Sequence, residues 1–130
     1  MDSNIIAMLV ITIFVVFIGF HIYTTYLTND KMYTELSLEK QTVKTIRDSI
    51  QDMFYQPNGA ITFIKIPENV MVSVYSKDNT TYIKTKNYYD AVPNVVLTQN
   101  VTITNTHTIV IKKISTDPNT GVITISINKA

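Results

Sequence analysis

The stretch of residues 5–20 reads IIAMLVITIFVVFIGF and is almost wholly apolar. Asp, Glu, Lys and Arg are absent from the whole of residues 3–29. About 20 mainly apolar residues allow a helix to cross the hydrocarbon core of a bilayer. Because lipid offers no hydrogen-bonding partners, the backbone of such a segment must satisfy its own polar groups, and a helix does so. The sequence therefore predicts a membrane helix over residues 1–30, with lipid as its surroundings.

A cleaved secretory signal is the main alternative for this segment. Such a signal has a basic leading region, about 7–15 apolar residues and a cleavage site of small residues. Residues 1–4 contain no Lys or Arg, the apolar run is longer, and no Ala-x-Ala pattern follows it. A retained anchor is therefore favoured. The side chains expected to face lipid or neighbouring helices are Ile5, Leu9, Ile13, Val16, Phe17 and Phe20.

Residues 31–56 predict a second, amphipathic half of the same helix. Apolar side chains recur there at spacings of three, four and seven residues, which form one stripe of a helix, while charged residues fill other positions. No Pro occurs before Pro57, and Gly19 is the one Gly before Gly59, so a continuous helix is expected to end at Pro57-Asn58-Gly59. The members of the stripe expected to pack on a sheet are Leu36, Val43, Ile46, Ile50 and Met53.

The junction between the two halves leaves an alternative open. Thr24, Thr25 and Thr28 have low helix propensity, and Asn29 or Asp30 could start a new helix as its N-cap. We favour one helix of about 50 residues, which would be about 75 Å long at the usual rise per residue.

From residue 57 to residue 130 the apolar period changes to two, which predicts a β domain. The clearest alternation is that of Ile123, Ile125 and Ile127 with polar neighbours. Turn-forming residues separate the candidate strands, including those at 90–94 and 105–106. The result is an α+β protein in which the long helix packs on an antiparallel sheet or a small β-sandwich. The strands are expected at residues 60–66, 70–76, 80–86, 95–104, 108–114 and 122–128.

This layout of apolar helix, amphipathic continuation and Thr- and Asn-rich β domain resembles the type IV pilin superfamily. The resemblance is greatest to the archaeal branch of pilins, archaellins and pilin-like accessory subunits, and it covers the whole chain. It implies that the apolar half-helix anchors the subunit in the membrane and later packs into the core of a helical homo-oligomer, a pilus-like filament. It also implies a β domain that faces outward at the cell surface.

Two features depart from the pattern of that family. Prepilins carry a short basic leader with a cleavage site ahead of the apolar run, whereas residues 1–4 have none, and Ile5 stands where many bacterial members have a Glu. The sequence is therefore expected to be either already processed or that of an uncleaved accessory protein. An accessory or stator protein of an archaellum or pilus would bind envelope or filament proteins. A viral or envelope structural membrane protein is a further alternative.

Composition and motifs argue against catalysis, and we expect no catalytic, cofactor-binding or metal-binding residues. The formal net charge is +1, so the chain lacks the strong positive charge that would indicate a nucleic-acid partner. It contains no Cys, so neither a disulfide nor a thiolate metal site can form. The two His do not form a zinc-binding pattern, and His21, close to Tyr23 and Tyr26, fits the interfacial belt of a membrane helix. The segment of residues 117–121 contains oxygen ligands, but a hairpin turn explains it better than a calcium loop does.

The β domain has two candidate surface features, an alternation of Tyr and Lys and two patterns for N-glycosylation. Tyr and Lys alternate over residues 82–89 in a way that suits a nucleic-acid or sugar platform, although an ordinary exposed strand face is the favoured interpretation. Asn79 and Asn100 each begin an N-x-Thr pattern, the acceptor for N-glycosylation on an extracellular surface.

Overall fold

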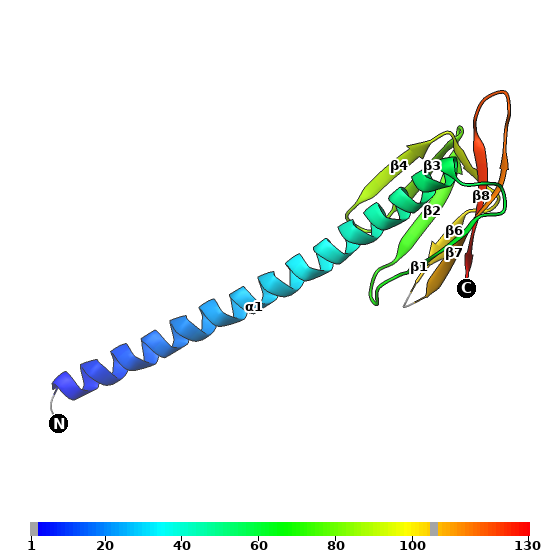
Figure 1. Ribbon diagram of the computed structural model, residues 1–130. Coiled ribbons are helices and arrows are strands. Elements are labelled where there is room, and N and C mark those ends of the chain that lie inside the picture. The colour runs from blue at the N-terminus through cyan, green and yellow to red at the C-terminus, as the bar shows by residue number, and fades with distance from the viewer. Residues whose placement is uncertain (1–2, 105–106) are drawn as a thin grey trace. The chain divides into compact units, whose positions relative to one another are not determined.

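The computed structural model describes residues 3–104 and 107–130, except for the side chains of residues 30–33 (Figure 1). One long helix, α1, is continuous from Ser3 to Asp52, and a short 3-10 helix, η1, covers Met53–Tyr55. The helix ends where expected, because Gln56 is extended and Gly59 adopts a φ of 90°. Internal contacts divide the chain into two compact units, Met1–Glu35 and Leu36–Ala130.

The second unit contains two four-stranded sheets in addition to the last turns of α1. The first sheet has the strand order β1-β7-β8-β5, and the second has the order β4-β3-β2-β6. The fold is therefore α+β, with a long apolar N-terminal helix and two sheets, which is a pilin-like architecture. The strands are β1 Ile61–Lys65, β2 Val72–Lys77, β3 Thr80–Lys84, β4 Tyr89–Pro93, β5 Val95–Leu97, β6 Val101–Ile103, β7 Thr108–Thr116 and β8 Ile123–Lys129.

Three details of the expected β domain are wrong. The turn expected at residues 90–94 is largely a strand, β4, which pairs with β3 at the edge of its sheet. The single strand expected at residues 95–104 is two strands, β5 and β6, which belong to different sheets. Because β5 runs parallel to β8, the first sheet is mixed rather than antiparallel. The turn expected at residues 105–106 lies outside the described residues.

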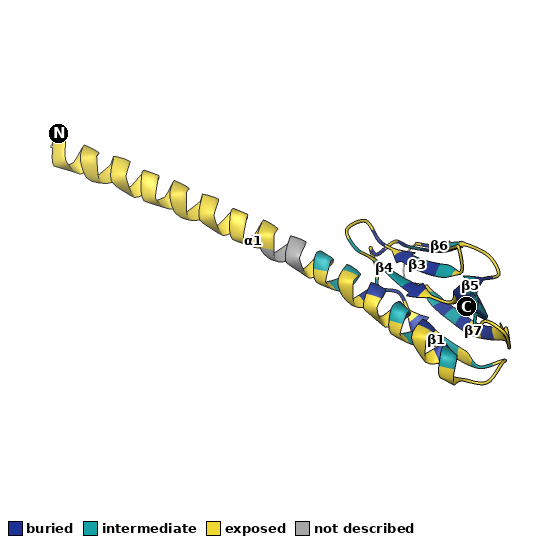
Figure 2. Ribbon diagram, turned by 90° about the horizontal axis from the view of Figure 1, so that it is seen from above, coloured by how far each residue is buried: buried dark blue, intermediate teal, exposed yellow. Residues whose placement is uncertain are grey.

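On β2 and β8 the buried face follows the alternation seen in the sequence, whereas on β1 Ile61 and Phe63 are exposed (Figure 2). Ile123, Ile125 and Ile127 on β8 are buried, as are Val72 and Val74 on β2. β-Branched side chains suit this pattern because they are stiff and pack well on a pleated surface. The two sheets and the last turns of α1 thus share a single apolar core.

A two-residue turn joins β2 to β3 at the centre of the second sheet. Lys77 and Thr80 are paired across the hairpin, so the loop consists of Asp78 and Asn79. Both loop residues have positive φ, 53° and 61°. This is the geometry of a type I′ turn, whose twist matches that of the strands, and Asn and Asp are among the few residues that adopt it readily.

A buried lysine joins the end of the helical segment to the first sheet. Lys113 on β7 is 4% exposed, and its Nζ donates a hydrogen bond of 2.7 Å to the carbonyl oxygen of Gln56. The backbone of Lys113 also bonds with that of Gly59 and Ala60. A cation is favourable near the last carbonyls of a helix, because these carry a partial negative charge. Lys113 therefore stabilises the turn from the helix into β1.

Replacing Lys113 with Met should lower the free energy of unfolding by about 1–2 kcal/mol. The thioether keeps much of the apolar stem but cannot donate a hydrogen bond to Gln56. Lys112 is the matched control, because it is the exposed neighbour on the same strand. Lys112→Met should change the free energy by no more than about 0.5 kcal/mol. Denaturant unfolding of the full chain in detergent, followed by circular dichroism, measures both; equal losses would contradict the role given to Lys113.

Candidate assembly and membrane surface on the N-terminal helix

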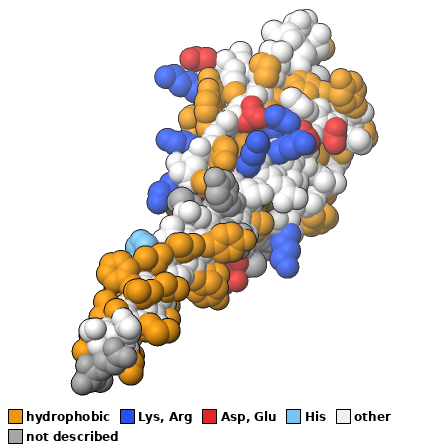
Figure 3. All heavy atoms as spheres, turned by 90° about the vertical axis from the view of Figure 1, so that its left-hand side faces the viewer, with side chains coloured by type: hydrophobic (Ala, Val, Ile, Leu, Met, Phe, Trp, Pro, Cys, Tyr) orange, Lys and Arg blue, Asp and Glu red, His pale blue; other side chains and the backbone are white. Residues whose placement is uncertain are grey.

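The first unit presents an apolar helix surface that is exposed on every side. All described side chains over residues 3–29 are exposed, and Figure 2 draws this part of α1 entirely in the colour for exposed residues. Hydrophobic side chains also cover most of the same part in the space-filling view of Figure 3. The six residues expected to face lipid or neighbouring helices are between 52% and 76% exposed: Ile5, Leu9, Ile13, Val16, Phe17 and Phe20.

The threonine hydroxyls of this segment are satisfied within the helix. Thr12 donates a hydrogen bond of 2.8 Å to the carbonyl oxygen of Met8, one turn earlier. Thr24 and Thr25 both donate to the carbonyl oxygen of His21, at 3.0 and 2.9 Å. A hydroxyl bonded in this way carries no unpaired donor into an apolar environment, where an unpaired polar group would be costly. The threonine hydroxyls of the segment are thus compatible with lipid or with a packed helix bundle.

The distribution of apolar residues determines what this surface can bind. A helix with one apolar stripe buries that stripe against one partner, whereas a helix that is apolar all round must be covered on all sides. Over the described residues, one helical run, Ser3–Tyr55, is long and apolar enough to cross a membrane, and a signal sequence near the N-terminus would meet the same test. Lipid and a bundle of like helices both supply complete cover.

The expected helix–sheet stripe divides into a buried part and a half-exposed part. Val43, Ile46, Ile50 and Met53 are all buried in the apolar core of the second unit. Leu36 is only half-buried and is not part of that core. Leu38, which is not a member of the expected stripe, also packs against the core.

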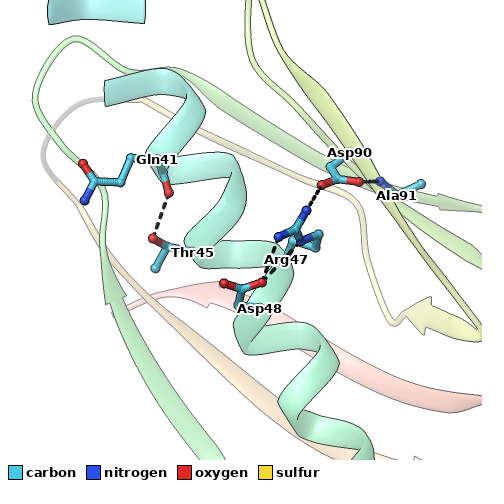
Figure 4. Close-up of polar contacts among 6 residues, drawn as sticks. All are labelled: Gln41, Thr45, Arg47, Asp48, Asp90 and Ala91. Carbon is cyan, nitrogen blue, oxygen red and sulfur yellow. Dashed lines mark hydrogen bonds and ion pairs between the residues drawn. The ribbon is translucent and has the colours of Figure 1, made fainter. Parts of the chain in front are cut away.

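Charged contacts hold the last turns of α1 against the edge of the second sheet. Arg47 donates a hydrogen bond of 2.7 Å to Oδ2 of Asp90 on β4, and it also forms an ion pair with its neighbour Asp48 (Figure 4). The hydrogen bond to Asp90, followed by that to Asp48, raises the pKa of Arg47. Two residues before Arg47, Thr45 donates a hydrogen bond to the carbonyl oxygen of Gln41, one turn earlier in the helix. The ion pair with Asp90 orients the helix against the second sheet.

The aromatic residues on the second sheet form a ladder rather than a platform. The rings of Tyr75 and Tyr82 stack with centroids 5.3 Å apart, and those of Tyr82 and Tyr89 stack at 6.3 Å. Rings this close and nearly parallel cover each other's faces, so the faces of Tyr82 are not available to a base or a sugar. Tyr88 packs against the core instead. The ladder is therefore a set of cross-strand pairs that stabilise the sheet.

The remaining candidate for a ligand site is the hairpin between β7 and β8. Oδ1 of Asp117 accepts hydrogen bonds from the backbone N–H groups of Asn119 and Thr120. The bond from Asn119 is the main cause of a lowered pKa of Asp117. The carboxylate is thus occupied within its own turn, as in an Asx-turn. Among the described residues, no group of three or more His, Asp or Glu side chains could hold a metal ion.

Comparison with known proteins provides no relative from which a function could be transferred. No protein-family model matches the chain, and no curated protein or solved structure is significantly similar to it.

Proposed function

We propose that this protein is a structural subunit of a pilus-like extracellular filament that polymerises through its N-terminal helix. The observation that carries the proposal is the change of pattern along α1. Residues 3–29 are apolar and exposed on all sides, whereas Val43, Ile46 and Ile50 form one buried stripe in the core of the β domain. One helix therefore supplies both an assembly surface and the cover of a folded domain.

The energetics of the apolar surface favour complete burial. Each large apolar side chain gains about 1.5–3 kcal/mol when it is removed from water, so the whole segment gains tens of kcal/mol. Lipid can supply this cover before assembly, and neighbouring copies can supply it in a filament. Because lipid tails are as apolar as the side chains, close packing rather than the hydrophobic effect would drive the exchange of lipid for protein neighbours.

The β domain fits the outer layer of such a filament. Most of its alternating apolar side chains are buried in its own core, and polar residues occupy many of the outward positions of the strands, such as Thr124 and Ser126 on β8. A domain with a self-contained core can face water while the helix is buried. We therefore place the β domain outside the cell and assign the protein a structural rather than a catalytic role.

Electron microscopy of the membrane and surface fractions from producing cells tests the proposal. Helical filaments should be present, and subunit-resolution reconstruction should place residues 3–29 in their core. Immunogold labelling of an epitope tag at the C-terminus should decorate the filament surface. If only monodisperse single-pass protein is found, the filament proposal fails.

A membrane-anchored accessory or stator protein is the second candidate, and the aromatic residues near the end of the apolar segment favour it. Tyr23 and Tyr26 are 61% and 68% exposed, and aromatic side chains of this kind settle at the membrane–water interface. A permanent anchor would keep them there. Co-purification of the detergent-solubilised protein with an envelope or filament component, without filaments of its own, would support this candidate.

A further inference from the structure

We propose that Asn100 accepts an N-linked glycan on the folded protein, whereas Asn79 accepts one only before the domain folds. Both residues begin an N-x-Thr pattern, but in the folded protein the Thr of one pattern is exposed and the Thr of the other is buried. Glycosylation of this protein in the cell depends on the proposed function, since N-glycosylation requires a β domain outside the cell. The difference between the two sites depends on the fold alone.

Both reactive groups of the Asn100 pattern are accessible. Asn100 is exposed in the loop between β5 and β6. Its Oδ1 accepts a hydrogen bond of 3.2 Å from the backbone N–H of Ser76, and among the described residues its amide nitrogen has no partner. Thr102, whose hydroxyl completes the pattern, is exposed too, and in the described part of the chain that hydroxyl has one hydrogen-bond partner, the hydroxyl of Ser73, at 3.4 Å.

The strand that carries Thr102 is also easy to open locally. β6 has three residues and lies at the edge of its sheet, where β2 is its one partner in that sheet. Freeing Thr102 breaks the pairing with Ser73, while Ile103 can remain buried opposite Val72. Short edge segments open at far lower free energy than the core of a domain does. A transferase can therefore bind the acceptor in an extended form without unfolding the protein.

The Asn79 pattern is only half accessible. Asn79 is exposed in the type I′ turn between β2 and β3, so the fold tolerates a sugar on its side chain. The hydroxyl that completes its pattern belongs to Thr81, which is 0% exposed. Oγ1 of Thr81 donates a hydrogen bond of 2.9 Å to the carbonyl oxygen of Val95. An enzyme that must bind this hydroxyl cannot reach it in the folded domain.

The position of β3 makes local exposure of Thr81 costly. β3 lies between β2 and β4, so Thr81 is paired with Ser76 on one side and Val92 on the other. Releasing it breaks both ladders and opens the core beside Ile83, which is fully buried. Such an opening approaches global unfolding. Modification of Asn79 must therefore precede folding.

The reaction is a transfer from a lipid-diphosphate-linked oligosaccharide. The amide nitrogen of Asn100 forms a bond to the anomeric carbon of the first sugar, and the bond from that carbon to the diphosphate oxygen breaks. The lipid diphosphate leaves with the electron pair, and the amide nitrogen loses one proton to a base. No change of oxidation state is involved.

The test uses the full chain, folded in detergent micelles, with a purified single-subunit oligosaccharyltransferase and a lipid-diphosphate-linked oligosaccharide. Occupancy at each site is followed by mass spectrometry of proteolytic peptides. Two synthetic peptides, residues 76–84 and 97–105, serve as unfolded references for the intrinsic preference of the enzyme. After normalisation to these peptides, the initial rate at Asn100 should exceed that at Asn79 by at least about tenfold.

Matched variants link the result to the two hydroxyls. Thr102→Ala should abolish modification at Asn100, because the exposed hydroxyl is lost while the core is untouched. Equal normalised rates at the two sites would overturn the inference, as would an unmodified Asn100 whose peptide is modified. Since this reaction requires neither filaments nor a cell surface, such a failure would leave the proposed function as it is. Conversely, an absence of filaments in cells would not alter the difference between the two sites.

Discussion

Replacing Ile46 with Asp should unfold the β domain. Ile46 is 0% exposed and lies on the last turns of α1, within the core shared by the helix and both sheets. An aspartate there would either hold an unpaired charge in an apolar site or take up a proton at a cost, and it would also leave a cavity. We expect a loss of about 4 kcal/mol or more, which is close to the whole stability of a small domain.

Lys44, which lies two residues earlier and is exposed, provides the matched control for Ile46→Asp. Lys44→Asp should change the free energy of unfolding by no more than about 0.5 kcal/mol. Ile46→Val gives a milder variant that still folds, with an expected loss of about 0.5–1.5 kcal/mol. Thermal and denaturant unfolding of the full chain in detergent measure all three. Equal melting temperatures for Ile46→Asp and Lys44→Asp would mean that this face of the helix does not cover the core.

Replacing Ile13 with Arg should prevent both membrane residence and filament assembly. Ile13 lies near the middle of the apolar segment and is 64% exposed. An arginine at the centre of a membrane helix costs about 2.5–3.5 kcal/mol on insertion scales, which corresponds to a loss of about 100-fold in the inserted fraction. The same charge in a packed bundle of like helices would repeat in every subunit, where the copies repel one another.

Two variants control for general effects of Ile13→Arg. Ile13→Leu keeps the apolar surface and should behave as the parent protein does. Thr28→Arg adds the same charge about four turns further along the helix, where the long side chain can reach water, and it should be tolerated. Vesicle flotation measures membrane binding, and filament yield measures assembly. If Ile13→Arg filaments form at the parental yield, the assembly surface has been assigned to the wrong part of the protein.

The helix could be predicted almost completely from the sequence. The apolar stretch of residues 5–20, the stripe that includes Ile46 and Ile50, and the stop at Pro57-Asn58-Gly59 all act through near neighbours. The structure accordingly contains one uninterrupted α1 rather than a second helix that starts at Asn29 or Asp30. A seven-residue spacing does not reveal where the sheets end, and Leu36, at the first position of the stripe, is only half-buried.

The pairing of the strands could not be predicted in the same way. The segment of residues 89–93 contains Asp, Ala and Pro, all of which have low β propensity. It nevertheless forms β4, because the backbone of β3 pairs with it and because an edge strand tolerates a terminal Pro. The residues of β5 and β6 alternate as one long strand would. The polar sequence Thr98-Gln99-Asn100 was the one local sign that the chain moves from one sheet to the other.

The sequence by itself determined the local elements of this protein: an apolar helix that needs cover on all sides, an amphipathic continuation, and a β domain with alternating faces. Only the tertiary structure decided that β5 runs parallel to β8, that Lys113 is buried beneath the end of the helix, and that Thr81 is buried while Thr102 is exposed. The physical reason is the range of the interactions. Periodicity, caps and turn residues act over a few neighbouring positions, whereas pairing and burial depend on contacts between segments that are distant in the chain.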